Sequence, residues 1–241
     1  MNLFITAGNT QTPVDQVRCI TNVFTGRTGA RIAQAAHERG HRVTIATSHP
    51  ETVHDVSRTK LGSDADFVVL PYRTFEDLES IMAAEIRSGR YQAVIHAAAV
   101  NDYHVAGAYS PGPQVTFDSQ QLTMTAEPPP VRWQPATGAK IKGNHAELWL
   151  RMVPAPKLVD KIRTDWQFTG TLVKFKLEVN VSDAELLAIG EASRVHSRAN
   201  WLVANTLEGR NDWAYLLGDH RPPVKIIRDQ LASQLLSAIG C

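Results

Sequence analysis

The feature that most constrains the fold of this chain is the alternation of short apolar runs with segments of helical periodicity. In the first hundred residues, strand-like runs at 3–7, 42–47 and 93–99 alternate with helical patterns at 28–39 and 74–88. This order is typical of a parallel sheet with helices on both faces. The pattern predicts an α/β fold of Rossmann-like, three-layer α/β/α type with a mainly parallel sheet.

The second half of the chain resumes this pattern after a long interruption. From 105 to 139 six prolines break any regular pattern, which predicts an irregular loop or lid within a single domain of residues 1–241. Residues 213–217 and 224–227 predict a C-terminal β-hairpin extension around Gly218-Asp219. The other expected elements are strands at 146–153, 171–177 and 201–204 and helices at 156–163, 183–197 and 229–239.

Charge and cysteine content exclude several classes of function. With 25 basic and 24 acidic residues, the chain has no electrostatic footprint for nucleic acid or an anionic membrane. Its two cysteines make no disulfide framework, and its first residues lack the regions of a signal peptide. No apolar run approaches the ~20 residues needed to span a bilayer. We therefore expect a cytoplasmic protein that binds small molecules.

A loop before the first helical pattern has the composition of an anion-binding segment. Residues 20–29 combine Asn22 and Thr25 with Gly26 and Gly29, and the helical pattern begins directly afterwards. The first N–H groups of a helix are unpaired and lie at the positive end of its dipole. A phosphate or carboxylate is therefore expected at this helix start.

Other polar or small residues follow the predicted strands, where ligands bind in open parallel sheets. Residues 8–10 and 204–206 come after two such strands, and 97–103 after a third. Small side chains at 97–99 let a flat ligand approach the backbone, and Asp102 can accept hydrogen bonds from a ribose or base. Each segment is equally consistent with an ordinary turn.

Two pairs of lysines and one histidine leave alternatives open. Lys140 and Lys142 follow the proline-rich segment, where one could clamp a phosphate, or both could be solvated on an edge strand. Lys174 and Lys176 lie on one face of a predicted strand, which we expect to open on solvent or on an anion. His96 lies within an apolar strand, which is typical of a core histidine.

Taken together, these segments resemble the phosphopantothenate–cysteine ligase family in its stand-alone form, related to the C-terminal domain of the DNA/pantothenate metabolism flavoproteins. The resemblance covers nearly the whole chain and depends on several segments in the same order. They are 6–10, 13–18, 20–22 with 26–29, 98–103, 139–141, 175–178 and 204–205.

The resemblance implies an activity, co-substrates and a dimer. The family joins 4′-phosphopantothenate to cysteine through an acyl-nucleotide, using CTP or ATP with Mg²⁺. Magnesium is expected mainly on the triphosphate, so no metal ligands are assigned to the protein. Family members are homodimers.

The resemblance also implies site residues. Asn22 and Lys140 are the expected catalytic residues, Asn22 stabilising the acyl-phosphate and Lys140 clamping phosphates. The expected nucleotide-binding residues are Gly8, Asn9, Thr10, Ala98, Ala99, Asp102, Lys140, Pro156, Phe175, Arg194 and Arg198. The expected residues for the other substrate are Asn22, Thr25, Gly26, Arg27 and Asn205.

Departures from the family pattern favour one alternative function, and the fold class allows another. Lys174 replaces a usual glycine, and a pair of family lysines is absent from the 183–197 helix, where Arg194 and Arg198 have the same spacing. These changes favour, as an alternative, a nucleotide-binding paralogue without ligase activity. A short-chain NAD(P)-dependent oxidoreductase suits the fold class, but its Tyr-x-x-x-Lys pair is missing.

Overall fold

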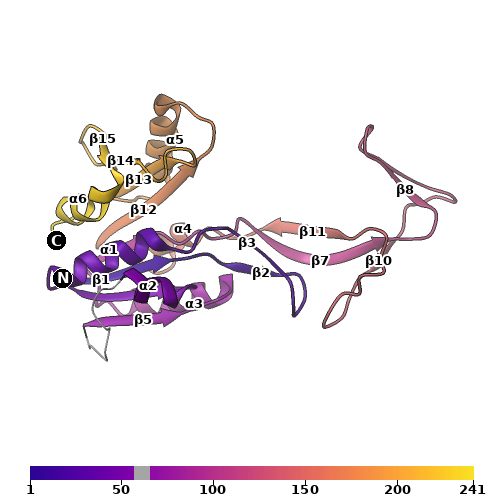
Figure 1. Ribbon diagram of the computed structural model, residues 1–241, viewed down its shortest axis with the longest axis horizontal. Coiled ribbons are helices and arrows are strands. Elements are labelled where there is room, and N and C mark those ends of the chain that lie inside the picture. Colours follow the sequence, from indigo (N-terminus) through magenta and orange to yellow (C-terminus); the bar gives the residue numbers. More distant parts are fainter. Residues whose placement is uncertain (57–65) are drawn as a thin grey trace. The chain divides into compact units, whose positions relative to one another are not determined.

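The main sheet of the protein has eight strands in the order β15-β14-β13-β12-β6-β1-β4-β5 (Figure 1). The computed structural model describes residues 1–56 and 66–241. Strands β13 to β5 pair in parallel, whereas β14 and β15 extend the sheet antiparallel. The strands are β1 (Asn2–Ala7), β4 (Arg42–Thr47), β5 (Phe67–Pro71), β6 (Ala93–His96), β12 (Thr171–Glu178), β13 (Trp201–Thr206), β14 (Trp213–Gly218) and β15 (Val224–Ile227). The mainly parallel sheet and the C-terminal hairpin are confirmed.

Helices cover both faces of this sheet, because its strands alternate apolar side chains between two cores. Val203 belongs to the core shared with α1 and α6, whereas Leu202 and Ala204 belong to the core shared with α5. The helices are α1 (Arg27–Glu38), α2 (Pro50–Val56), α3 (Phe75–Arg87), α4 (Leu158–Thr164), α5 (Asp183–His196), the 3-10 helix η1 (Arg228–Gln230) and α6 (Leu231–Ala238). The three-layer arrangement is confirmed.

The contacts divide the chain into two compact units, where we had expected one domain. The first unit comprises Met1–Thr10, Asn22–Val100 and Lys157–Cys241 and contains the eight-stranded sheet. The second unit comprises Gln11–Thr21 and Asn101–Pro156.

The second unit is built from antiparallel strands, so the expectation of an irregular segment at 105–139 is wrong. Strand β7 lies between β10 and β11, and two further ribbons pair β2 with β3 and β8 with β9. Prolines are tolerated because Pro111 and Pro135 end their strands. The bounds are β2 (Gln11–Pro13), β3 (Cys19–Thr21), β7 (Tyr103–Pro111), β8 (Val115–Asp118), β9 (Thr123–Ala126), β10 (Trp133–Pro135) and β11 (Trp149–Pro154).

Three smaller differences concern the first unit. Strand β5 and helix α2 were not expected, because their short patterns carry little periodicity. Strand β6 ends at His96, three residues before the predicted end, and the chain then continues as an extended loop. Within the described ranges, no helix has the length and apolar character needed to cross a membrane.

Candidate functional site

Two glycine turns meet at the carboxyl end of β1. Gly8 has a φ of +86° and Gly26 a φ of +80°. A Cβ atom at Gly26 would lie 2.2 Å from the backbone nitrogen of Gly8, and one at Gly8 would lie 2.2 Å from Ser48 Oγ. Only glycine tolerates both this backbone conformation and this approach. The loop that precedes α1 is thereby held directly against the end of the first strand.

Asn9 and Asn22 fasten this loop to its neighbours. Asn9 Nδ2 donates to the backbone oxygen of Asn22 at 2.5 Å, and Asn22 Nδ2 donates to the backbone oxygen of Ala99 at 3.1 Å. Ser48 Oγ accepts from the Asn9 backbone N–H and donates to Asn9 Oδ1. The Asn22 amide thus bridges the loop to the segment after β6. Asn22 itself does not line the cavity at this end of the sheet, whereas its sequence neighbour Val23 and its hydrogen-bond partner Ala99 do.

A cavity of about 440 Å³ lies where the parallel strands of the first unit end and α1 begins. Residues after β1 and β6, the ends of β12 and β13 and the start of α1 all contribute to its wall. Expected site residues among its lining are Gly8, Thr25, Gly26, Arg27, Ala98, Ala99, Phe175 and Asn205. This is the edge at which open parallel sheets bind ligands.

The charge of this cavity favours an anion. Arg27, Lys176, Arg210 and Arg228 line it, and within the described part of the chain its lining includes no aspartate or glutamate. The N-cap of α1 is Gly26, which offers no side chain to the first N–H groups of the helix. No acidic residue occupies the first turn of α1. Helix N–H groups without a side-chain cap, together with these cationic side chains, are suited to a phosphate or carboxylate group.

The sequence reasoning missed four polar lining residues that lie outside the 20–29 loop. Lys176 was noted only for its strand face, and Arg210, Asn211 and Arg228 were not singled out. Arg210 and Asn211 lie just beyond the carboxyl end of β13, and ligands bind at this edge of open parallel sheets, so their position after a predicted strand was a usable signal. Arg228 follows the hairpin, and no local motif marks it.

Ala98 and Ala99 are held against β1 by backbone hydrogen bonds. The Ala99 N–H donates to the Gly8 oxygen at 2.8 Å, and the Thr10 N–H donates to the Ala99 oxygen at 3.3 Å. The Ala98 N–H donates to Thr6 Oγ1 at 3.3 Å. These bonds fix the small side chains along the cavity wall.

Lys174 does not open on solvent as expected. It is 8% exposed, and its ammonium donates to Ser193 Oγ at 2.9 Å and to the Ser193 backbone oxygen at 3.2 Å. Burial lowers the pKa of Lys174. The expectation therefore fails at Lys174 because α5 covers it, while Lys176 lines the cavity and pairs with Glu178 at 3.0 Å.

His96 is the core histidine that the sequence predicts. It is buried beside Lys174 in the sheet register, with its Nδ1 2.8 Å from Thr6 Oγ1. Burial, reinforced by the charge of Lys174, lowers the pKa of His96 to about 4. The ring is therefore neutral at physiological pH.

The two arginines expected to replace family lysines lie outside the cavity lining. The Arg194 guanidinium is buried and donates to both Glu191 carboxylate oxygens, to Asp219 Oδ1 at 2.6 Å and to the Ala199 backbone oxygen. Its donors are used within the protein, so the structure gives no support to a role on phosphates. Arg198 is exposed and has a φ of +52° after the end of α5.

Asp102, Lys140 and Pro156 belong to the second unit and are exposed there. The expected edge strand around Lys140 is absent from the described structure, which has a bend at this position. The neighbouring Ile141 N–H donates to Asp15 Oδ2 at 3.0 Å. Lys140 therefore lies in a loop that the hydrogen bond from Ile141 to Asp15 holds in place.

Asp15 organises this part of the second unit. Its carboxylate accepts from the Arg18 guanidinium and from the backbone N–H groups of Val17, Arg18 and Ile141. Arg18 in turn donates to the Ile141 backbone oxygen at 2.7 Å. The Arg18 contact and the backbone bonds hold the pKa of Asp15 well below its usual range.

The family model of the DNA/pantothenate metabolism flavoprotein C-terminal domain matches residues 1–128, which is more than half of the chain. The chain belongs to this family. The predicted membership is confirmed, and the family segment includes the Gly8 and Gly26 turns and Asn22.

Two curated relatives are bifunctional proteins. The chain is 28% identical over 208 residues to the coenzyme A biosynthesis bifunctional protein CoaBC of Thermococcus kodakarensis, covering 86% of this chain and 41% of the relative. It is 30% identical over 124 residues to CoaBC of Vibrio vulnificus, covering 52% of this chain and 28% of the relative. The chain therefore spans less than half the length of these relatives.

Solved structures confirm the fold. The DNA/pantothenate metabolism flavoprotein from Streptococcus pneumoniae superposes with a TM-score of 0.75 at 23% identity, covering 99% of this chain and 98% of that one. A Cab2 mutant in complex with phosphopantothenate-cysteine gives a TM-score of 0.69 at 16% identity, covering 99% and 84%. At these identities the likeness establishes the Rossmann-like α/β fold of the family.

Proposed function

We propose that this chain is a phosphopantothenate–cysteine ligase that acts in coenzyme A synthesis. The observation that carries the proposal is the cation-lined cavity at the carboxyl ends of the parallel strands, built by segments on which the family resemblance depends. The names of the curated relatives, which are coenzyme A biosynthesis proteins, support it.

The first step of the proposed reaction places the phosphorylated acid. Its phosphate binds at the start of α1, where Thr25, Gly26 and Arg27 line the cavity and the helix N–H groups lack a side-chain cap. Asn205, 9% exposed at the end of β13, contributes an amide to the same wall. Binding the phosphate here fixes the far end of the substrate, so that its carboxylate has a defined reach.

In the second step, the carboxylate attacks the α-phosphorus of the nucleoside triphosphate. The new bond joins a carboxylate oxygen to that phosphorus, and pyrophosphate leaves. Phe175 packs against the nucleotide, while Gly8, Ala98 and Ala99 shape the wall. Asn9 and Thr10, which were also expected to bind the nucleotide, are buried and do not line the cavity. Cysteine's amine then attacks the acyl carbon, the amide forms, and the nucleoside monophosphate leaves with the bonding electron pair.

Asn22 and Lys140 are the proposed catalytic residues. The Asn22 amide donates to the Ala99 backbone oxygen, in the loop after β6. A small shift of this loop therefore also moves the Asn22 amide. Preorganised donors of this kind stabilise charge that develops in the transition state. Asp102, Lys140 and Pro156, which belong to the second unit, are proposed as nucleotide-binding residues from the family resemblance alone.

Magnesium is proposed to accompany the triphosphate and to neutralise its charge. Within the described ranges, no group of three histidine, cysteine, aspartate or glutamate side chains could hold a metal ion. The family resemblance implies a Mg²⁺ ion carried mainly by the triphosphate, which would supply its ligands together with water. The protein's own part is then to hold the phosphates with cationic side chains and backbone N–H groups.

Pyrophosphate release tests the proposal. Purified protein receives phosphopantothenate, cysteine and Mg²⁺ with either CTP or ATP, and the amide product is identified by its mass. The ligase predicts release with at least one nucleotide and only when the acid substrate is present. Absence of release with both triphosphates would leave the second candidate, a nucleotide-binding paralogue without activity, favoured by the internal pairing of Arg194.

We also propose a cytoplasmic homodimer. The second unit exposes an aromatic groove lined by Tyr109, Trp133 and Trp149, and Trp133 is 40% exposed. Large exposed aromatic side chains are enriched at protein interfaces. Light scattering on the purified protein measures the mass, and a monomer at all concentrations would contradict the dimer.

The two cysteines are free, in keeping with a reducing compartment.

A further inference from the structure

We propose that Asp15 is a positioning residue for Lys140, because it holds the backbone that presents this lysine to the phosphates of the nucleotide. The inference rests on the proposed function, in which Lys140 clamps those phosphates. In the sequence Lys140 and Lys142 are equivalent, whereas the contacts of their backbone separate them. All of these contacts lie within the second unit.

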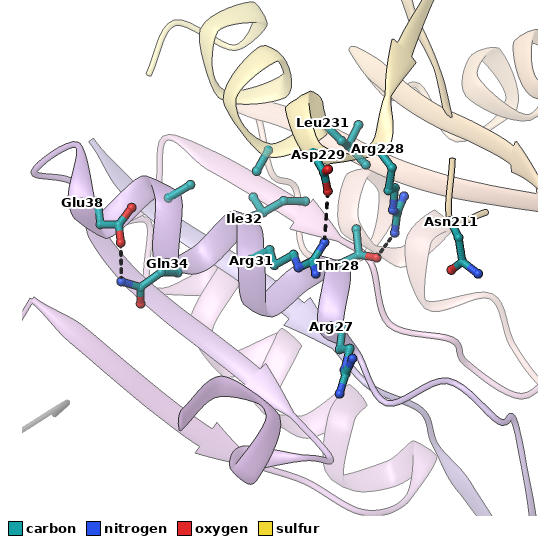
Figure 2. Close-up of a pocket in the computed structure, with 12 residues that line it drawn as sticks. Arg27, Thr28, Arg31, Ile32, Gln34, Glu38, Asn211, Arg228, Asp229 and Leu231 are labelled. Atoms are coloured by element: carbon teal, nitrogen blue, oxygen red, sulfur yellow. Dashed lines mark hydrogen bonds and ion pairs between the residues drawn. The ribbon is translucent and has the colours of Figure 1, made fainter. Parts of the chain in front are cut away.

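The cations that line the cavity of the first unit are supported within that unit. Arg228 donates to the Thr28 hydroxyl (Figure 2), and Lys176 pairs with Glu178 at 3.0 Å. Lys140 belongs to the second unit, so its support has to be found there. A lysine side chain has many rotamers, and its ammonium group is placed no better than the backbone that carries it.

Hydrogen bonds hold the chain on both sides of Lys140. The Gln16 N–H donates to the Ala139 backbone oxygen at 3.0 Å, and the Ile141 N–H donates to Asp15 Oδ2 at 3.0 Å. Asp15 and Gln16 both lie in the turn between β2 and β3. Lys140 is exposed between the two anchored residues. One turn therefore fixes the backbone of Lys140 from both directions.

Lys142 is placed differently. Among the described residues, the hydrogen bonds to the β2–β3 turn end at Ile141, whose oxygen accepts from Arg18 Nη2 at 2.7 Å. The Ile141 side chain is buried in the small apolar core of this unit. Lys142 comes after this anchor, and an exposed turn at Gly143 follows it directly. Of the two lysines, only Lys140 lies between residues that the turn holds.

A carboxylate suits position 15 because donors converge on both of its oxygens. Asp15 Oδ1 closes the turn by accepting from the Val17 N–H at 2.9 Å and from the Arg18 N–H at 2.7 Å. Asp15 Oδ2 accepts from the Arg18 guanidinium at 2.5 Å, in addition to the Ile141 N–H. The Asp15 side chain is 1% exposed, so loss of this acceptor leaves buried donors without a partner. Only an ionised carboxylate offers acceptors alone on both sides.

A double-mutant cycle on nucleotide affinity separates positioning from a general effect on stability. Calorimetry measures the Kd of each variant for CTP and for ATP with Mg²⁺, without the other substrates. Asp15→Asn keeps one oxygen for the turn but replaces the other by an NH₂ group, and we expect it to weaken binding by about fivefold. Lys140→Ala should weaken binding by about tenfold. Adding Asp15→Asn to Lys140→Ala should change the affinity by less than about twofold, because the side chain that Asp15 positions is gone.

Asp118→Asn is the matched control. Asp118 Oδ1 accepts from the Gln120 and Gln121 N–H groups at 2.8 and 3.0 Å in the turn between β8 and β9, much as Asp15 Oδ1 does in its own turn. The Asp118 turn lies elsewhere in the second unit, so the control should leave nucleotide affinity unchanged. Equal losses in Asp118→Asn and Asp15→Asn would overturn the proposal. Additive losses from Asp15→Asn and Lys140→Ala would overturn it as well.

Hydrogen exchange tests the hold on the segment without any ligand. The Gln16 N–H reports on it, since it bonds to Ala139 and not to Asp15, and its protection should fall about tenfold or more in Asp15→Asn. The Ala136 N–H, bonded to the Ala108 oxygen at 2.8 Å, should keep its protection and so show that the unit is folded. If it does not, Asp15→Glu, which keeps the charge, replaces Asp15→Asn with the same expectations. Unchanged protection at Gln16 overturns the proposal.

The positioning role and the proposed function fail in different ways. A wild-type protein that binds neither CTP nor ATP overturns the ligase and, with it, the role of Lys140 on phosphates. Nucleotide binding by the wild type, with additive losses in the double variant, overturns only the positioning role of Asp15.

Discussion

The two units of this protein differ in how far their strands are buried. This difference decides whether the strands of each unit can be predicted from the sequence. Strand β1 is buried along nearly its whole length, with Leu3, Phe4 and Ile5 inaccessible to solvent. Strand β7 is only partly buried at most of its positions, and β10 is exposed throughout. Strands covered on both faces need continuous apolar runs, whereas half-exposed strands do not. Most strands of the first unit are therefore recognisable in the sequence, whereas in the second unit only β11 matches an expected strand, at 146–153.

The largest expected effect tests the glycine contact of the first unit. Gly26→Ala places a methyl group against the Gly8 backbone at a φ of +80°, so we expect a loss of about 3 kcal/mol or more in stability, with loss of activity. Urea unfolding measures it. Gly40→Ala is the matched control, since Gly40 has a φ of +81° but nothing within 4 Å of the added atom. It should cost only about 1 kcal/mol. Similar losses in both variants would show that the close approach is unimportant.

The next effect tests whether Asn22 acts in the chemistry. Asn22→Ala removes an amide that donates to Ala99, and we expect kcat to fall by on the order of a hundredfold. The fold should persist, as circular dichroism can verify. Unchanged turnover in a folded variant would show that the amide only fastens the loop. Asn22→Asp keeps the size but not the donor, and it should be equally impaired.

A smaller effect brings the second unit into the comparison. Lys140→Ala should raise KM for the nucleotide by about tenfold, because a phosphate loses a charged partner. Steady-state kinetics with varied nucleotide measures it. Lys142→Ala, two residues along the same exposed segment, is the control and should leave KM unchanged. A neutral result for Lys140→Ala favours the reading of two solvated lysines.

The smallest effect is a pH dependence in the second unit. The folded pKa of Asp15 is depressed, so its stabilising contribution is present above the usual carboxyl value of about 3.9 and is lost as pH falls through the folded value. Asp15→Asn should flatten the acid limb of a thermal stability profile. The first unit's tryptophan Trp201 and the second unit's Trp149 can report separately, through single-tryptophan variants. A wild-type acid limb retained in Asp15→Asn contradicts this role.

Much of the first unit was predictable, because the apolar pattern that marks a buried strand or helix lies in consecutive residues. Strand β4 matches the expected range of 42–47, and His96 lies in the core as its apolar neighbours indicate. Where the sequence reasoning failed, a distant element decides the environment. Lys174 is covered by Ser193 of α5, and Arg194 is drawn into an ion pair with Asp219 beyond β14. Neither contact leaves a local pattern.

The candidate site was predictable in its glycines and small residues but not in its charge. Gly8, Gly26 and Ala98 follow strands or precede a helix, where close backbone approach has a local signature. Arg210 and Arg228 reach the cavity from segments beyond β13 and β15, so only the folded arrangement reveals them. In the second unit, the prolines at the ends of β7 and β10 gave a misleading signal. They were taken to exclude strands, whereas they only end them.

The four cationic side chains around the cavity have a practical corollary for handling the protein. Sulfate, citrate and phosphate from buffers or precipitants are attracted to the same wall of Arg27, Lys176, Arg210 and Arg228. A soaked nucleotide should therefore bind in crystals grown from polyethylene glycol at low ionic strength. In crystals grown from ammonium sulfate, sulfate should compete with it for the same side chains.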